Sequence, residues 1–505
     1  MKLKPVPKAI LILAIVGGLI FGVNLVLDSS FFKKTVATAS ATTKSVTTAV
    51  ASTVSAPLGG SIGSNNDPLK VSIVSFHGYA PALVANGGNL KTQNGSIYSK
   101  QGVNVEFVIQ DNVPTLAEIF ESKAAHCAWR TSDFWAQEQP NLRNAGKDGR
   151  AVMVVDNTQG GDAIIAKDAS IKTVEDLADK TVALLQFTPS HGLIIDAIEN
   201  SSLSARKKTS IKFVFINVEE GTAGVRAAFE SGKVDAAVLW DPDLSLALRG
   251  GGHVVYSTKI ASNLIYDVMV CNKQVLDDSK GKQAVQKFVD GWLAGVTAAR
   301  QDPDSAVEAL VATEELFKLL AKQEGKPFIK SLFPNLVWTG IEDNARILGI
   351  VGGTNHYERV YGQFDQIYRK AGALANPNSP VIAPQDSFDY SFIQTALSNN
   401  AGARQAAAKL TEVFTAEGLK QATRNTVAVT KPVMVTFTTG SAELTQRAKK
   451  TIDTEMIPFI ENNGKAYIVV SGNTDSVGSN DVNKPLSQKR AKVVVDYLVK
   501  QWDFQ

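Results

Sequence analysis

Two residues near the end of the chain have the types and the spacing to bind a charged ligand. Asp475 follows residues 466–471, which predict a strand, and Arg490 lies one turn inside a helix predicted to start near Pro485. A guanidinium offers a planar fork of donors that suits a carboxylate, whereas a carboxylate accepts hydrogen bonds from an ammonium group. We therefore expect Asp475 and Arg490 to grip a zwitterionic amino-acid head group, which is binding and not catalysis.

Positions around this pair form a longer pattern. It comprises residues 471–478, Asn483, 486–487 and 490–491, together with 435–437 and 440–444 upstream. The pattern closely resembles the OmpA-like peptidoglycan-binding module. By that resemblance Asp475 and Arg490 hold the free end of diaminopimelate in the peptidoglycan stem peptide, and Asn483 supports the loop. The chain has Asn473 where the family has His, and it reaches Gln505 where the family continues, so residues 431–505 are expected to form a partial, truncated α+β OmpA-like domain.

The length and composition of the chain limit its class. A chain of 505 residues exceeds what one hydrophobic core normally supports, so about two to four domains are expected. Hydrophobic residues make up 44% and charged residues 20%, as in a folded soluble protein. The net charge of +3 gives no electrostatic support for binding nucleic acid.

Few residues suit a metal or a cofactor. The five histidines are scattered without metal-ligand spacing, and the only cysteines are Cys127 and Cys271. The sequence has no phosphate-cradling Gly-Lys-Ser/Thr loop, no Gly-x-Ser-x-Gly elbow and no His-Glu-x-x-His stretch. We therefore predict no cofactor and no metal. The two cysteines either pair in an oxidising compartment or remain buried thiols.

Residues 1–28 have the features of a membrane anchor or signal segment. Three lysines precede an uncharged apolar run, residues 9–27, which is long enough to cross a bilayer as a transmembrane helix with the lysines in the cytoplasm. A cleavable signal is the alternative, because residues 37–39 have a small-x-small form. We favour an uncleaved anchor in the inner membrane. Residues 29–66, rich in Ser, Thr and Ala, predict a flexible linker.

Residues 67–397 alternate short apolar strands with helix-like segments. This alternation predicts an α/β fold with mostly parallel sheets, whose ligands bind beyond the carboxyl ends of the strands. The loops at those ends carry the predicted ligand-binding residues: His77, Tyr79, Trp129, Thr131, Asp133, Phe187, Thr188, Ser190, Trp240 and Asp241.

Two of these loops allow a statement about ligand charge. Thr188 and Pro189 predict a helix start, with Thr188 as its cap, that favours an anionic group or carries no ligand. Asp241 either accepts from a ligand hydroxyl or ammonium, or is only a turn residue before Pro242.

Five stretches between residues 69 and 372 carry a second resemblance. They are residues 86–88, 102–103, 171–177, 188–191 and 231–242, the last reading Ser-Gly-Lys-Val-Asp-Ala-Ala-Val-Leu-Trp-Asp-Pro. Together they look like the periplasmic solute-binding proteins of the nitrate, sulfonate, taurine and thiamine-precursor ABC transporter group. The resemblance implies a type II-like periplasmic-binding-protein fold, in which two doubly wound lobes close around a ligand.

The resemblance also implies domain boundaries. Lobe 1 would comprise about residues 67–160 and 260–397, lobe 2 about residues 163–256, and a connector, residues 398–430, would lead to the OmpA-like domain. The two crossings between the lobes are expected near residues 157–162 and 257–266. Cys127 and Cys271 would then lie on neighbouring strands of lobe 1, where a disulfide is geometrically possible.

The leading hypothesis is a non-enzymatic periplasmic protein that captures a small solute between its lobes and is associated with the cell wall. It would be anchored in the cytoplasmic membrane by its N-terminal helix, and it would serve ABC-type import through a permease, or solute sensing. One alternative is an envelope spacer or protein-docking body that has lost its ligand, and another is an enzyme that uses His77 or His191.

The charge of the solute stays open in the sequence. Arg130 and the helix start at Thr188 suit an anion, whereas Asp133, Asp241 and the tryptophans suit an amine. A zwitterion could use both sets.

Overall fold

The structure is a computed structural model that describes residues 62–111, 124–370, 373–374, 376, 378–400, 402–409, 429–464, 466–472 and 479–502. The predicted membrane anchor at residues 9–27 and the predicted wall-binding residue Asp475 both fall outside these ranges. Within them, no helix is both long enough and apolar enough to cross a membrane.

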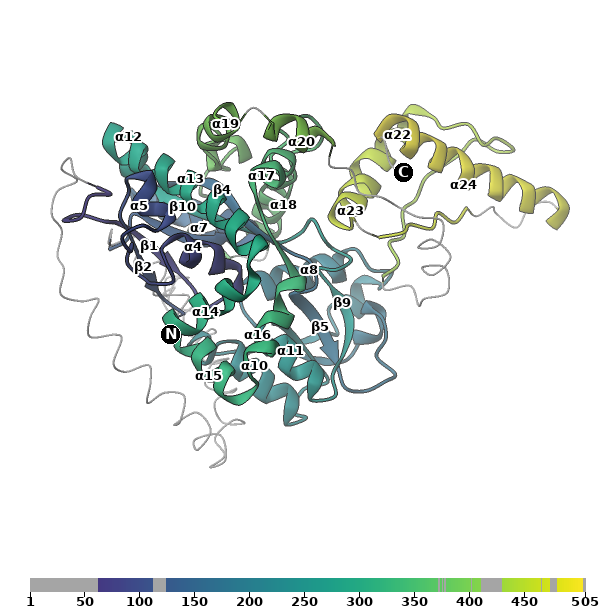
Figure 1. Cartoon of the computed structure of the whole chain (residues 1–505). Helices are drawn as coiled ribbons and strands as arrows, with labels where there is room; N and C mark the ends of the chain where they lie inside the picture. Colours follow the sequence, from purple (N-terminus) through teal and green to yellow (C-terminus); the bar gives the residue numbers. More distant parts are fainter. Residues whose placement is uncertain are drawn as a thin grey trace, which may run out of the picture. The chain divides into compact units, whose positions relative to one another are not determined.

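The first lobe is built on a six-stranded sheet (Figure 1). Its strands, in spatial order, are β11 (Leu336–Trp338), β4 (Gly149–Thr158), β10 (Tyr266–Asn272), β3 (Cys127–Thr131), β1 (Leu69–Ile73) and β2 (Val105–Ile109). β1 is parallel to β2 and β3, whereas β10 is antiparallel to β3 and β4, and β11 is antiparallel to β4. The expectation of mostly parallel sheets is therefore wrong here, because β4 carries the chain out of the lobe and its neighbour β10 brings it back. It also fails in the second lobe, where β5 is antiparallel to β8 and β9 while β6 is parallel to β7 and β8.

Helices cover this sheet and fill the core around it. The long helix α13, whose buried residues recur every three or four positions, packs against α4 and α5. The helices of the first lobe are η1 (His77–Tyr79), α4 (Ala80–Ala85), α5 (Ile97–Gln101), α7 (Ser132–Asn144), α12 (Lys273–Asp277), α13 (Ser279–Gln301), α14 (Pro303–Thr313), α15 (Glu315–Gln323), α16 (Lys326–Leu332), η4 (Phe333–Asn335), α17 (Ile341–Ile347), α18 (His356–Lys370), η5 (Pro384–Ser387), α19 (Ser391–Ser398) and α20 (Ala403–Lys409).

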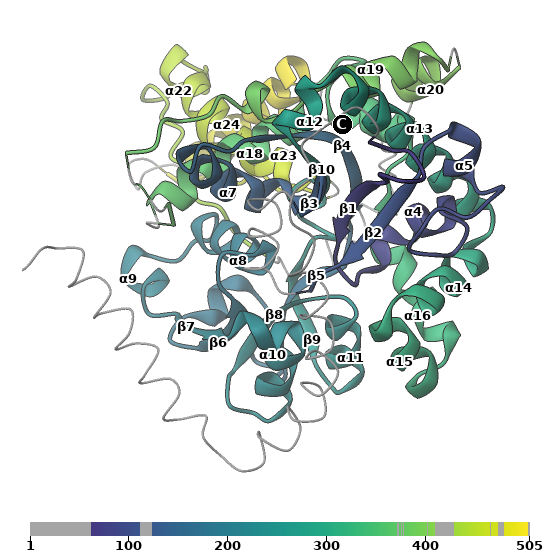
Figure 2. The same cartoon turned by 90° about the vertical axis from the view of Figure 1, so that its left-hand side faces the viewer.

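The second lobe is built on a five-stranded sheet (Figure 2). Its strands, in spatial order, are β7 (Lys212–Ile216), β6 (Thr181–Leu185), β8 (Ala236–Trp240), β5 (Asp162–Ala166) and β9 (His253–Ser257). Its helices are η2 (Val174–Leu177), α8 (Pro189–Glu199), α9 (Ala205–Lys208), η3 (Val218–Glu220), α10 (Gly221–Glu230) and α11 (Asp243–Arg249). The chain enters this sheet at Asp162, just after β4 ends at Thr158, and leaves it after Ser257 to form β10. Two α/β lobes joined by two crossing segments are therefore present, as expected.

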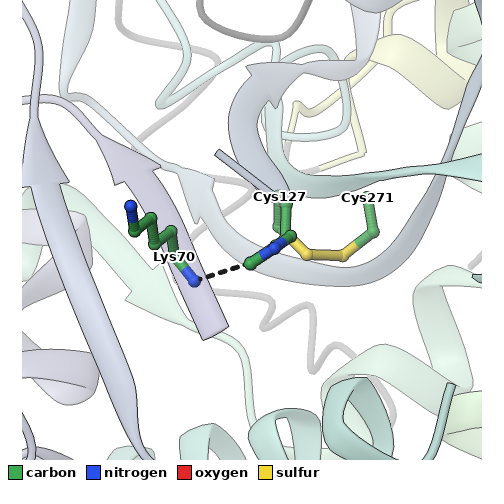
Figure 3. The surroundings of a disulfide bond; sticks show 4 residues. Lys70, Cys127 and Cys271 are labelled. Carbon is green, nitrogen blue, oxygen red and sulfur yellow. Dashed lines mark hydrogen bonds between the residues drawn. A yellow bond between two sulfur atoms is a disulfide. The ribbon is translucent and has the colours of Figure 1, made fainter. Parts of the chain in front are cut away.

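A disulfide joins the two central strands of the first lobe. Cys127 at the start of β3 lies directly opposite Cys271 in β10, and the two sulfur atoms are bonded (Figure 3). Beside them, Nδ1 of His126 accepts a 2.9 Å hydrogen bond from the backbone N–H of Lys70. Of the two cysteine states that the sequence left open, the structure has the bonded one.

The C-terminal region has its own small core. Its helices are α22 (Gln446–Thr451), the π-helix η6 (Ile452–Met456), α23 (Ile457–Asn462) and α24 (Asn480–Trp502). Three isoleucines from η6 and α23 pack with Val494 and Leu498 of α24. The predicted strand at residues 466–471 is wrong, since none of these residues pairs with a strand among those described, and extended backbone needs such a partner. The predicted helix starts earlier than expected, at Asn480, with Pro485 inside it.

Candidate ligand-binding site

Three neighbouring strands of the first lobe place two carboxylates side by side. Thr131 ends β3, Asp267 lies opposite it in β10, and Asp267 in turn lies opposite Asp156 in β4. Directly opposite residues of an antiparallel pair point to the same face of the sheet. β1 is parallel to β3, so the loop after β1 lies at the same edge. This edge therefore gathers Thr131, Asp156 and Asp267 with residues 76–79.

The loop after β1 adds aromatic rings to the two carboxylates. The Tyr79 hydroxyl donates a 2.7 Å hydrogen bond to Oδ2 of Asp267, and the Tyr79 ring meets the Trp129 ring edge to face, 6.5 Å between centroids. Asp156 lies against Gly78 of the same loop, since a Cβ atom on Gly78 would be 2.0 Å from its Oδ2. His77 is buried with its ring stacked on Phe333, 6.2 Å between centroids.

The second lobe contributes two more carboxylates next to the crossing. Asp162 starts β5 and lies opposite Trp240 of β8, and Asp241 follows directly. Asp241 accepts hydrogen bonds from the hydroxyl and the backbone N–H of Ser245, at 2.6 and 3.0 Å. It also accepts one from the side-chain amide of Asn335 in the first lobe, at 2.7 Å. Asp241 is thus more than a turn residue, because it links the two lobes.

Helix α8 starts where it was predicted, but the Thr188 side chain does not cap it as predicted. Helix α8 begins at Pro189 with Thr188 in the capping position. The Thr188 hydroxyl does not cap the helix, however, and instead donates to the carbonyl of Leu185, at 2.9 Å. The buried carboxylate of Asp133, from the first turn of α7, lies against this end of α8: a Cβ atom on Gly192 would be 2.5 Å from its Oδ2. A carboxyl group of the protein thus lies beside this helix start, where Ser190 is also buried.

The side chains of Phe187 and His191 pack against each other. The Phe187 ring lies 5.5 Å from the His191 ring and 6.2 Å from that of Tyr368, and its backbone N–H donates to Nδ1 of His191 at 3.2 Å. Burial lowers the pKa of His191 to about 4 and that of His77 to about 3. Both imidazoles are therefore neutral and weakly basic near pH 7, which is unfavourable for general acid-base catalysis.

Arg130, the one cation considered for an anionic ligand, is already paired. Its guanidinium forms a two-pronged ion pair with Glu138 of α7, which includes an Nη2 to Oε1 bond of 2.8 Å. Nη1 donates to the carbonyl of Trp129 at 2.6 Å. Both charged side chains are buried, so the positive charge is neutralised inside the first lobe.

The carboxylates of the site resist ionisation. Burial, the largest cause, raises the pKa of Asp133 and Asp241 to about 6 and that of Asp267 to about 7. Burial together with the neighbouring carboxylates raises the pKa of Asp156 and Asp162 well above the ordinary value. Neither carboxylate oxygen of Asp156 has a hydrogen-bond partner among the described residues.

The sequence prediction missed Asp156, Asp162 and Asp267. A signal was present, because Asp156 ends the run Met-Val-Val-Asp and Asp267 interrupts the run Ile-Tyr-Asp-Val-Met-Val. A carboxylate within an apolar strand indicates a buried charge, which needs a partner.

The predicted wall-binding residues are only partly described. Arg490 lies in α24, where its Nε donates to the carbonyl of Ser441 at 3.0 Å and its guanidinium covers the Phe437 ring at 5.0 Å. Asn483 lies near the start of the same helix. Because Asp475 is outside the described residues, its pairing with Arg490 stays a prediction.

Comparison with known proteins finds the same two regions that the motifs marked. Residues 91–306 match the family NMT1/THI5 like, and residues 436–502 match the OmpA family. The chain carries an NMT1/THI5-like domain and an OmpA-family domain. The suspected fusion is thereby confirmed.

One relative of the chain is named as a binding protein. An aliphatic sulfonates-binding protein of Escherichia coli (strain K12) is 38% identical over 89 residues, which are 18% of this chain and 26% of that protein. The chain thus matches about a quarter of the length of this relative.

Solved structures similar to the chain include one enzyme. The periplasmic aliphatic sulphonate binding protein SsuA from Escherichia coli has 18% identity and a TM-score of 0.48, covering 64% of this chain and 97% of that one. The periplasmic nitrate-binding protein NrtA from Synechocystis PCC 6803 has 12% identity and a TM-score of 0.49, covering 68% and 98%. The desulfurization enzyme DSZB has 15% identity and a TM-score of 0.46, covering 66% and 99%.

Proposed function

We propose that this protein captures a small solute between the two lobes of its NMT1/THI5-like domain, without chemical conversion, and is tethered to the cell wall by its OmpA-family domain. The observation that carries the proposal is the group of buried polar side chains where the lobes meet. Asp133 and Asp156, each buried with both oxygens unpartnered among the described residues, are members of this group. Buried polar groups normally have partners, so a group left open in this way is suited to a ligand.

The ligand-binding residues proposed from the sequence fall into two sets. His77, Tyr79, Trp129, Thr131 and Asp133 come from the first lobe, and Phe187, Thr188, Ser190, Trp240 and Asp241 come from the second. We add Asp156, Asp162 and Asp267 to these ligand-binding residues because they lie where the lobes meet. A spacer that has lost its ligand is disfavoured, because it would be expected to have packed apolar side chains where this protein buries five carboxyl groups.

The comparisons support a proposal for the location and the partners. The E. coli relative is named as a binding protein, and the OmpA family supports an envelope role. We propose a periplasmic location, an inner-membrane anchor at residues 9–27, and transfer of the solute to an ABC permease or its detection by a sensor. Lobe closure around the solute would be the signal that either partner recognises.

Calorimetric titration of the full-length protein with envelope solutes tests solute capture. The panel contains amines, sulfonates, nitrate, amino acids and neutral pyrimidines. We expect saturable heat from at least one class, and its loss in the variant Asp241→Ala, which removes the link to Asn335. Absence of heat from the whole panel, with a native circular dichroism spectrum, would contradict the proposal.

Wall tethering has a separate test. Asp475, Asn483 and Arg490 are proposed to bind the peptidoglycan stem peptide, so purified cell-wall sacculi should retain the protein. Asp475→Ala should release it, whereas Asp481→Ala, an exposed carboxylate at the start of α24, should not. Equal retention of both variants would show that the wall is bound elsewhere or not at all.

A further inference from the structure

The meeting point of the lobes holds a cluster of five buried carboxylates. Asp133, Asp156 and Asp241 are fully buried, and Asp162 and Asp267 are only 3 and 4% exposed. They come from α7, β4, the loop after β8, β5 and β10. The cluster is continuous, because the field of Asp267 acts on Asp156 and the fields of Asp133, Asp241 and Asp267 act on Asp162.

Among the described residues, neither Arg130 nor His77 offers its charge to this cluster. Arg130, which lies opposite Val268 in the next strand, is held by Glu138, so this pair adds no net charge. His77 is neutral near pH 7. Tyr79 donates to Asp267, and Ser245 and Asn335 donate to Asp241. The hydroxyl groups of Thr131 and Thr158 lower the pKa of Asp133 and of Asp162, respectively. Asp156 has no such donor among the described residues and still lacks partners for both oxygens.

The features that would hold an anion are occupied. Arg130 is neutralised, and the N-terminal turn of α8 faces the carboxylate of Asp133. Helix N-termini favour negative charge, but Asp133 lies beside Gly192 in the first turns of α8, so a sulfonate or nitrate approaching this turn would meet a carboxyl group. An anionic ligand entering here would face five carboxyl groups.

The surroundings of the carboxylates suit an organic cation. Trp338 lies opposite Asp156 in the neighbouring strand, and Phe76 and Tyr79 come from the loop that contacts Asp156. Aromatic rings attract alkylammonium groups, and an ammonium supplies the donors that Asp156 lacks. Among the described residues, no group of three side chains has the geometry to hold a metal ion, which favours an organic cation.

We propose that the solute bound between the lobes is an organic ammonium ion, received by Asp156 and Asp267 and by aromatic rings beside them. This inference rests on the proposed function, that the lobes bind a small solute. It departs from what the names of the sulfonate- and nitrate-binding proteins describe, because the site gathers carboxyl groups, which accept hydrogen bonds from an ammonium ion.

The test compares cationic and anionic probes on the full-length protein. Calorimetry and thermal shift are measured with putrescine and choline, and with ethanesulfonate and nitrate. We expect at least one of the two cations to bind and neither anion to bind. Asp156→Asn keeps the shape of the side chain and should weaken cation binding by about 10- to 100-fold, as expected for a lost charge-assisted hydrogen bond.

A stability measurement shows whether a variant loses binding only because it misfolds. Asp156→Asn removes a buried like charge next to Asp267, so the ligand-free variant should melt about 2–4 °C above the wild type at pH 8. Asp267→Asn is the second variant and should also weaken cation binding. The control is Asp304→Asn, a surface carboxylate paired with Lys330, which should change neither property.

The outcomes separate the two proposals. A higher melting temperature combined with weaker cation binding supports the inference. Binding of ethanesulfonate or nitrate, or cation binding that Asp156→Asn leaves unchanged, overturns the inference and keeps solute capture. Failure of every solute in the wider panel overturns both.

Discussion

At the scale of single residues, the fold of the candidate site places carboxyl groups close together, which is electrostatically unfavourable. Asp156 and Asp267 lie directly opposite each other, an arrangement that destabilises a sheet when both side chains are charged. Polar groups of this kind are retained where a function needs them, at a cost in stability. Replacing one of these carboxylates by a neutral side chain should therefore increase the stability of the ligand-free protein.

The pH dependence of that gain is a first prediction. Asp156 has a folded-state pKa raised by burial and by the facing carboxylates Asp267 and Asp162. Because the folded-state pKa is raised, Asp156 contributes to stability at low pH. This contribution is lost as the pH rises through the folded-state pKa. We expect the melting temperature of ligand-free Asp156→Asn, minus that of the wild type, to be positive at pH 8 and to shrink toward pH 5.

Differential scanning calorimetry from pH 5 to pH 8 measures this difference. The buried histidines, with pKa values lowered to about 3 to 4, titrate alike in both proteins and cancel. The hydroxyl of Tyr79 also faces the site, but it stays protonated in this range because burial raises its pKa. A difference that does not change with pH would count against a buried, uncompensated carboxylate.

Gly192 gives a second prediction at this scale. In a helix, Gly→Ala normally stabilises by about 1 kcal/mol. In α8 the new methyl group would lie 2.5 Å from Oδ2 of Asp133 and 3.0 Å from the Phe364 ring, and such overpacking costs about 1–3 kcal/mol. We expect Gly192→Ala to lower the free energy of unfolding in urea. The control is Gly362→Ala in α18, whose nearest neighbour would be 3.4 Å away and which should be neutral or stabilising.

At the scale of elements, one pair of strands carries both the disulfide and the site. Cys127 starts β3 opposite Cys271, and Thr131 ends β3 opposite Asp267. These two ends are four residues apart, roughly 13 Å along the strand. A slip of one residue would turn Asp267 to the other face of the sheet, so the pairing of β3 with β10 must be held in register. The disulfide holds it.

Removal of the disulfide is the prediction that belongs here. It closes a loop with a sequence separation of 144 residues, and such bonds stabilise mainly by restricting the unfolded chain. Replacing both Cys127 and Cys271 by Ala should lower the free energy of unfolding by about 2–4 kcal/mol, measured with guanidinium chloride. A reducing agent should have the same effect on the wild type and none on the double variant. Equal stability of oxidised and reduced wild type would contradict the role assigned to the bond.

At the scale of the whole molecule, the two proposed activities are assigned to two regions that match different families. The NMT1/THI5-like match ends at residue 306 and the OmpA-family match starts at residue 436. The carboxylate cluster and the proposed wall-binding residues share no residue. Each activity should therefore be lost without the other.

Reciprocal variants of the full-length protein test this independence. Asp156→Asn should weaken cation binding and leave retention on cell-wall sacculi unchanged, whereas Asp475→Ala should release the protein from sacculi and leave the calorimetric binding curve unchanged. If either variant impaired both activities, the domains would be coupled and the separation proposed here would be wrong.

The sequence by itself determined those helices and strands whose signals lie within a few neighbouring residues. Helix α8 and strands β6 and β8 lie where their apolar spacing, capping position and proline predicted them, since these signals act within a few residues. Helix α7 was missed, because Pro140 and its polar neighbours obscure its pattern. The two-lobed α/β fold and the domain pair followed from motifs of the same short range.

Only the tertiary structure decided which charges meet. The sequence left Arg130 and the start of α8 available for an anion, whereas the fold pairs Arg130 with Glu138 and brings Asp133 beside Gly192 of α8. It also places Asp267 against Asp156, 111 positions earlier, through the register of β10 on β4. Such pairings are set by strand register and lobe packing, which no local pattern of residues encodes, so the sign of the charge in the site emerges only when the chain is folded.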